Sequence, residues 1–342
     1  MLKLTNATRS FCQLKEGGDV RLLLLPFSAV YYAILVIWDF FWRKGIFKAR
    51  ALDARVISVG NITWGGTGKT PAVAAITKEL LKNGSRPAIL IRGYGNDEKD
   101  LLPRLISEVP VVVGRDRVKT GKAAIARHGA DTILLDDGFQ HRRLKRDLDI
   151  VCIDATAPFG NGCVMPAGSM REGLGSLKRS GVFLLTKVDL AQDTVRLEEK
   201  LKKINPNALI VKSIHAPGYF YKLSNEQLVD IEGLKGKNIA LVSAIGNPSS
   251  FEKTISNLGL GFKKHFIFRD HHFYAKRDLE SIEDYCKENN IVTIITTEKD
   301  AVKLKAISYQ LSAISFLVLH IELKIIDNEQ RLYSRLNRIH IN

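Results

Sequence analysis

The chain has 342 residues, of which 45% are hydrophobic, a length that suits two α/β domains of ordinary size and excludes a largely disordered protein. Its 51 Lys and Arg residues outnumber its 36 Asp and Glu residues and give a formal net charge of +15, which indicates an anionic partner: nucleic acid, acidic lipid or a phosphorylated substrate. The four cysteines form no C-x-x-C pair, which argues against a zinc site or a disulfide framework.

Near the N-terminus, residues 22–38 (LLLLPFSAVYYAILVIW) carry no charge. The run is slightly shorter than the roughly 20 residues that span a bilayer. Bulky aromatic and basic residues follow it rather than a small-residue cleavage site, so we expect the segment to be retained. Such flanks suit lipid headgroups. We predict a membrane-associated helix within residues 1–50, lying at or partly in the bilayer; a buried core helix and a full transmembrane span are the alternatives.

After residue 50, short β-branched runs alternate with longer amphipathic stretches, a pattern typical of βαβ units and a parallel sheet. The predicted fold class is therefore α/β, with a P-loop NTPase-type domain over residues 51–215. Helices are expected to begin near Thr70, Arg117 and Asp193. The expected strands of this domain are 56–59, 88–91, 111–113, 132–135, 150–153 and 182–185.

A second series of similar elements predicts a smaller C-terminal α/β domain over residues 237–342. Residues 216–236 contain the end of HAPGYFYKL and are predicted to be an extended linker. Helices are expected after Pro248 and around 279–287. The expected strands are 239–242, 266–268, 291–296 and 316–321.

The strongest local signal is the stretch 60–70, GNITWGGTGKT, which lies between a predicted strand and a predicted helix. Glycines let the backbone wrap around a phosphate group at a helix N-terminus, whose dipole favours anions. We expect Lys69 to reach the β- and γ-phosphates of ATP and the Thr70 hydroxyl to bind Mg²⁺. The predicted nucleotide-binding residues are Thr63, Trp64, Gly65, Gly66, Thr67, Gly68, Lys69 and Thr70.

A second acidic signal follows a buried strand, where TILLDDG places Asp136 and Asp137 at the strand end. Carboxylates at this position lie beside the phosphate loop in P-loop proteins and hold Mg²⁺ directly or through water. Two adjacent Asp residues are also common in helix caps and turns, which is the alternative.

The continuation DDGFQHR at 136–142 resembles the signature of the tetraacyldisaccharide 4'-kinases, the lipid A 4'-kinases of Gram-negative bacteria. The resemblance extends over most of the chain. It includes the apolar N-terminal helix, the GGTGKTP loop, RGYG at 92–95, VGRDR at 113–117, PAGSMRE at 166–172, DHH at 270–272 and TEKDAV at 297–302.

This resemblance implies transfer of the ATP γ-phosphate to the 4'-hydroxyl of an anionic tetraacyldisaccharide 1-phosphate, at the cytoplasmic face of the bacterial inner membrane. It also implies that Asp97 is the catalytic base, oriented by His271, and that Arg171 and Glu172 lie near ATP and Mg²⁺. The stretch between Gly95 and Asp97 is much shorter than in relatives that carry a hairpin there, and Lys99 replaces their usual Pro. Glu98 and Asp100 therefore stay open as the base.

Two other functions are compatible with parts of the sequence. Residues 186–189, TKVD, imitate the guanine-reading motif of GTPases, which favours a GTPase or regulatory ATPase as the alternative function. The basic run HRRLKR at 141–146 suggests nucleic-acid binding, but it lacks interleaved aromatic residues or a recognised reading module. We therefore expect an anionic lipid-linked sugar and a membrane surface as partners, and no nucleic acid. The oligomeric state does not follow from the sequence.

Overall fold

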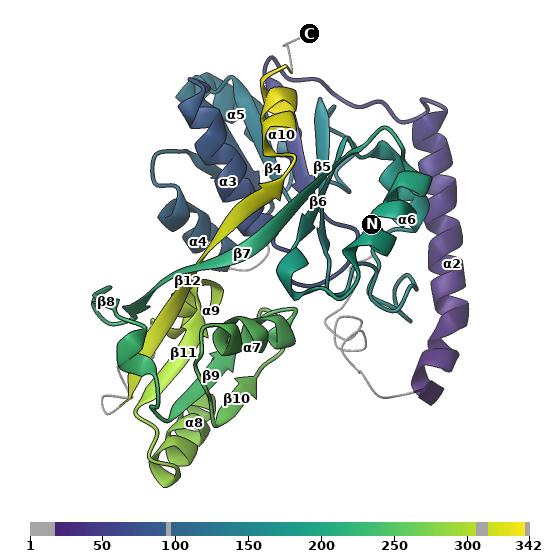
Figure 1. The fold of residues 1–342 in the computed structure, drawn as a ribbon. Helices are drawn as coiled ribbons and strands as arrows, with labels where there is room; N and C mark the ends of the chain where they lie inside the picture. Colours follow the sequence, from purple (N-terminus) through teal and green to yellow (C-terminus); the bar gives the residue numbers. More distant parts are fainter. Residues whose placement is uncertain (1–17, 94–96, 306–313, 339–342) are drawn as a thin grey trace.

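The computed structural model describes residues 18–93, 97–305 and 314–338. It confirms the predicted α/β class. Within these residues, twelve strands form one sheet that runs through both halves of the molecule (Figure 1). Eleven of them follow the order β10-β9-β11-β12-β7-β6-β5-β1-β4-β2-β3, and the short β8 pairs with β7.

The first half is a parallel sheet with helices on both faces. Its strands are β1 (Arg55–Gly60), β2 (Pro87–Ile91), β3 (Val111–Val113), β4 (Thr132–Asp136), β5 (Leu148–Asp154) and β6 (Val182–Thr186). Parallel strands are buried on both faces, which explains why each reads as a short apolar run. Every strand predicted for this half is present, with its ends extended by two residues or fewer.

Helices cover the two faces because successive strand residues point to opposite sides. In β1, Ile57 and Val59 face the core that contains Ile76 and Leu80 of α3 (Lys69–Lys82). Its neighbour Val56 faces the other core, which α5 (Arg117–His128) covers. On that second face α6 (Thr194–Ile204) covers the strands β5 and β6. A further helix of this half, α4 (Asp97–Leu105), packs on the α3 face.

The second half contains three further parallel strands beside β12. Two hydrophobic clusters, one on each face of these strands, form its core. Its strands are β9 (Ile239–Ser243), β10 (Lys264–Ile267) and β11 (Thr293–Thr297), and its helices are α7 (Pro248–Asn257), α8 (Lys276–Glu288) and α9 (Glu298–Leu304).

The two halves are joined by a ribbon of two long antiparallel strands, β7 (Leu209–Lys222) and β12 (Ser315–Asp327). The predicted linker 216–236 is therefore largely ordered: it comprises the end of β7, β8 (Leu228–Val229) and a short 3-10 turn. The predicted unit 237–342 is also divided, because α10 (Glu329–Asn337) returns to the first half. There Leu332 and Leu336 pack in the same core as Ile57 and Val59.

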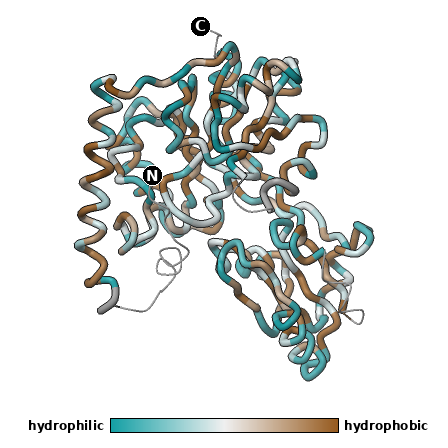
Figure 2. Tube along the Cα trace, turned by 180° about the vertical axis from the view of Figure 1, so that it is seen from behind, coloured by the Kyte–Doolittle hydropathy of each residue, from teal (hydrophilic) through white to brown (hydrophobic). Residues whose placement is uncertain are grey.

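The N-terminal helix α2 (Gly18–Arg43) lies along the side of the first half (Figure 1). In the described part of the chain, it is the helix long and apolar enough to cross a membrane. The candidate span, Arg21–Arg43, contains an 18-residue window with a mean hydropathy of 1.9, and only 6% of that window is buried. Figure 2 shows this helix as hydrophobic along most of its length. The predicted apolar helix is thus present, and its composition is consistent with membrane association.

Candidate active site

The phosphate loop connects β1 to α3, as the sequence predicts. Gly65 and Gly68 have φ angles of 116° and 80°, a backbone conformation that glycine adopts without steric cost. Gly68 is also the N-cap of α3, so the first N–H groups of the helix lie at the loop. The loop therefore has the conformation and the helix dipole that a phosphate site requires.

Polar contacts fix the loop to the strands beneath it. The Asn61 amide donates to the Thr67 hydroxyl at 2.8 Å, and the Thr186 hydroxyl donates to the Thr67 carbonyl at 3.0 Å. Lys187 Nζ donates to the Gly66 carbonyl at 2.9 Å. These bonds hold the loop in place before any ligand arrives.

Asp137 is the centre of the charged part of the site. It follows β4 with a φ of 55°, and its carboxylate accepts two hydrogen bonds from Arg171, at 2.7 and 2.8 Å. Lys69 Nζ lies 3.6 Å from the same carboxylate. Burial opposes ionisation of Asp137, but the charges of Arg171 and Lys69 outweigh it and hold its pKa well below the usual range. The structure thus brings together three of the predicted site residues.

Asp136 fits a cation site. Its side chain is almost fully buried, and its Oδ1 makes no hydrogen bond within the described residues. Burial, with Asp137 adding to it and Lys69 opposing it, raises the pKa of Asp136 to about 6. No group of three or more His, Cys, Asp or Glu side chains suited to a metal occurs in the part of the chain that the structure describes. This is compatible with Mg²⁺, which is usually held by one or two carboxylates together with phosphates and water.

Arg171 reaches Asp137 because its own segment is bound to the phosphate loop. The Trp64 N–H donates to the Ser169 carbonyl at 2.8 Å, and the Arg171 N–H donates to the Ile62 carbonyl at 2.7 Å. Between these two hydrogen bonds, the buried Thr63 pairs with Met170 in a single antiparallel β-bridge. The Arg171 guanidinium also bonds Asn61 and lies 5.6 Å from the centre of the Trp64 ring.

Glu172 points to a different set of partners. Its carboxylate accepts a hydrogen bond from Arg179 at 2.9 Å, and it is mostly buried. Binding of a metal by Glu172 would therefore require this ion pair to open. These neighbouring residues thus have different partners: Arg171 bonds to Asp137, and Glu172 bonds to Arg179.

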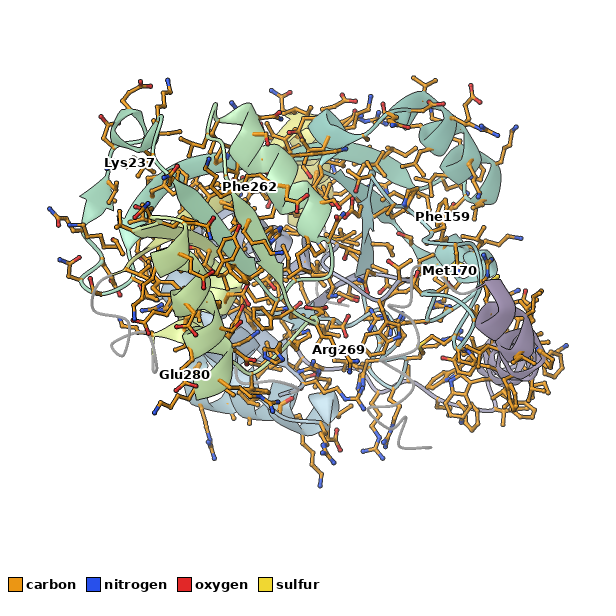
Figure 3. The ribbon with its side chains drawn as sticks, turned by 90° about the horizontal axis from the view of Figure 1, so that it is seen from below. Phe159, Met170, Lys237, Phe262, Arg269 and Glu280 are labelled. Carbon is orange, nitrogen blue, oxygen red and sulfur yellow. The ribbon has the colours of Figure 1, made fainter. Side chains whose placement is uncertain are left out.

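The second half contributes a group of charged side chains from the turn after β10 and from the start of α9. Lys299 Nζ donates to Asp270 at 2.8 Å and lies 3.3 Å from His271 Nε2. Burial opposes ionisation of Asp270, but the charges of Lys299 and, to a smaller extent, Lys69 lower its pKa. Asp270 therefore lies within electrostatic range of Lys69 at the phosphate loop. Figure 3 shows the neighbouring Arg269 near the middle of the molecule.

Gly246 brings the second half into direct contact with the phosphate loop. A Cβ at this position would collide with the Gly66 amide nitrogen and with the Gly65 Cα. Only glycine permits this approach.

Asp97 is the first residue of α4, but its side chain lies outside the described part of the chain, as do those of Glu98 and Asp100. Its pairing with His271 therefore stays a prediction. His271 has a φ of 63°.

Comparison with known families decides what kind of protein carries this site. A family model described as tetraacyldisaccharide-1-P 4'-kinase matches residues 20–340. The chain belongs to this kinase family.

Individual relatives support the assignment of the chain to this kinase family. The chain is 36% identical to a tetraacyldisaccharide 4'-kinase of Syntrophus aciditrophicus over 321 residues, which cover 85% of this chain and 86% of that one. It is also 36% identical to one of Elusimicrobium minutum, covering 85% and 84%. A crystal structure of LpxK from Aquifex aeolicus, described as an apo form in complex with ATP, has a TM-score of 0.71 and 27% identity and covers 94% of this chain and 99% of that one.

The motif TKVD at 186–189, which suggested a GTPase, has a structural role in this kinase. Lys187 Nζ donates to Asp154 at 2.6 Å as well as to the loop carbonyl of Gly66, and both side chains are buried. The Asn247 amide, from the second half, also donates to Asp154 at 3.0 Å. Sequence reasoning missed Asp154 and Asn247 as supports of the loop. The sequence signal for a role of Lys187 at the loop is its position directly after a buried strand, β6, of a P-loop protein.

Proposed function

We propose that this chain transfers the γ-phosphate of ATP to the 4'-hydroxyl of a tetraacyldisaccharide 1-phosphate, a lipid A precursor. The observation that carries the proposal is the convergence of Lys69, Asp137 and Arg171 at the phosphate loop of a chain that belongs to this kinase family. Two cations beside a phosphate-binding backbone suit a reaction in which negative charge shifts between phosphate oxygens.

The residues of the loop, 63–70, bind the ATP phosphates in this proposal, and Lys69 contacts the β- and γ-phosphates. The Thr70 hydroxyl and the carboxylates of Asp136 and Asp137 would hold Mg²⁺. The metal, when bound, neutralises charge on the phosphate oxygens. Arg171 is placed to release one of its bonds to Asp137 and contact the transferring group, since its guanidinium offers several donors.

Asp97 accepts the proton of the 4'-hydroxyl as its oxygen bonds to the γ-phosphorus and the bond to ADP breaks. The sugar hydroxyl is a weak nucleophile, so a positioned carboxylate accelerates its attack. His271, which lies beside Lys299 and Asp270, orients Asp97 when the halves close.

The anionic lipid substrate explains the basic charge and the apolar α2. We propose that α2 lies in the cytoplasmic leaflet of the inner membrane, with its aromatic and basic C-terminal end at the headgroups. Trp38, Trp42 and Phe47 form an aromatic cluster there, beside Arg43 and Lys44.

The direct test is an assay of the purified protein with tetraacyldisaccharide 1-phosphate and ATP that carries a labelled γ-phosphate. We expect label on the 4'-hydroxyl. A protein that hydrolyses GTP in preference to ATP and leaves the lipid unlabelled would support the GTPase alternative.

Thr70→Ala should chiefly raise the Mg²⁺ concentration needed for half-maximal activity, because it removes an expected metal ligand and leaves the loop backbone in place. The measurement is a Mg²⁺ titration at saturating ATP. Thr67→Ser keeps the hydroxyl that Asn61 contacts and is the matched control. An unchanged Mg²⁺ requirement in Thr70→Ala would remove this residue from the metal site.

Replacing four outward-facing apolar residues of α2 with Asn should lower binding to lipid vesicles by at least about 10²-fold, since each loses about 1.5–3 kcal/mol of burial in lipid. The positions are Leu23, Phe27, Val30 and Ile34, all more than half exposed. The measurement is sedimentation with vesicles of anionic phospholipid. A control pair, Val195→Asn and Val292→Asn, removes similarly exposed apolar residues that lie outside α2. Equal binding of the fourfold variant and the control would assign membrane attachment to another surface.

A further inference from the structure

The face of α2 that packs on the protein carries polar contacts, whereas its outer face is apolar. Apart from residue 41, the buried and half-buried side chains of α2 lie at positions 24, 28, 31, 35, 39 and 42, the spacing of one helical stripe. Among the described side chains of α2, Ser28 alone is fully buried. The polar residues Ser28, Tyr31 and Asp39 of this stripe each bond to the body of the protein. Membrane anchoring requires only the apolar outer face, so it does not explain the polar contacts that the inner face makes with the protein.

Ser28 and Tyr31 bind the segment that ends in Arg171. Ser28 Oγ donates to the Val164 carbonyl at 2.9 Å and accepts from the Ala167 N–H at 2.8 Å. One turn further along the helix, the Tyr31 hydroxyl donates to the Arg171 carbonyl at 3.1 Å. Figure 3 shows Met170 of this segment on the side of the molecule where α2 lies. The helix therefore holds the segment near its start and at Arg171.

The same arginine connects this contact to the phosphate loop. Its carbonyl is held by α2, and its guanidinium holds Asp137, which also lies 3.6 Å from Lys69. An uninterrupted series of polar contacts thus runs from Tyr31 through Arg171 and Asp137 to Lys69. A shift of α2 along or away from the body displaces the arginine backbone, and the guanidinium moves with it.

We propose that α2 is a positioning element for phosphoryl transfer as well as an anchor, with Ser28 and Tyr31 as the positioning residues that act through Arg171. The proposal rests on the proposed function, because it assigns Arg171 to the transferring phosphate. Binding of α2 to the membrane and alignment of the Arg171 guanidinium with the transferring phosphate then occur together.

The test uses full-length protein in mixed micelles with tetraacyldisaccharide 1-phosphate and ATP. Tyr31→Phe and Ser28→Ala should each lower kcat by about 5-fold, the effect of one lost hydrogen bond, and the double variant should lower it further. KM for both substrates and vesicle binding should stay at the wild-type values, because the hydroxyls face the protein. Tyr333→Phe, which removes a tyrosine hydroxyl bonded to Glu329 on α10, is the matched control and should keep the wild-type kcat.

A double-mutant cycle separates positioning from a general loss of structure. In an Arg171→Ala background, measured in single turnovers, Tyr31→Phe should have no further effect on the rate, since it acts through the missing guanidinium. A 5-fold fall in that background, or a full kcat in Tyr31→Phe itself, would overturn the proposal. An inactive wild-type enzyme would instead refute the proposed function.

Discussion

Lys69→Ala is expected to lower turnover by on the order of 10²-fold or more, because it removes a positively charged group that is directed at the transferring phosphate. Lys69 is the first residue of α3 and lies 3.6 Å from Asp137, which keeps its two bonds from Arg171 in the variant. The fold should therefore persist. The measurement is kcat with the lipid substrate, together with thermal unfolding.

The matched control is Lys82→Ala, which removes an exposed lysine from the last turn of the same helix. It should keep wild-type turnover. If Lys69→Ala retained near-normal activity with an intact fold, Lys69 would have no part in the mechanism.

Asp97→Asn and His271→Asn should each reduce turnover strongly, on the order of 10²-fold, while ATP binding persists, since neither residue belongs to the phosphate loop. Asparagine is the suitable replacement for His271 because that residue has a φ of 63°, a conformation that Asn tolerates better than Ala does. The measurements are kcat and the binding of a non-hydrolysable ATP analogue.

The double variant tests whether the two residues act as a unit. If His271 works by orienting Asp97, the double variant should be little slower than the slower single variant. Fully multiplicative losses would mean separate roles. An active Asp97→Asn enzyme would transfer the role of base to Glu98 or Asp100, and the same substitution at each of those positions would identify it.

The strands of the first half could be predicted because each is a short, fully buried apolar run in one stretch of sequence. β7 could not, because Pro217 and Gly218 are unfavourable within a central strand. The structure accommodates them where the pairing of β7 with β12 shifts register, between Leu319 and Ile321, with Ile321 opposite Pro217. This compensation depends on a strand about a hundred residues away and leaves no mark in the local sequence.

The candidate site likewise combines residues from contiguous motifs with residues from distant segments of the chain. The phosphate loop and the two aspartates are contiguous motifs, so their types and order were sufficient to predict them. The support of the loop by Asp154, Lys187 and Asn247 is assembled from three segments in both halves. The ion pair between Glu172 and Arg179 depends on where the next turn of the chain lies. Neither arrangement can be predicted from the spacing of these residues in the sequence.

The return of α10 to the first half has a consequence for how the protein is made. The core beneath the phosphate loop includes Ile325, Leu332 and Leu336, which are synthesised long after the loop itself. A ribosome delivers the phosphate loop early, but the core that supports the loop lacks these side chains until α10 has left the exit tunnel. The first half therefore completes its folding only after the second half has been synthesised.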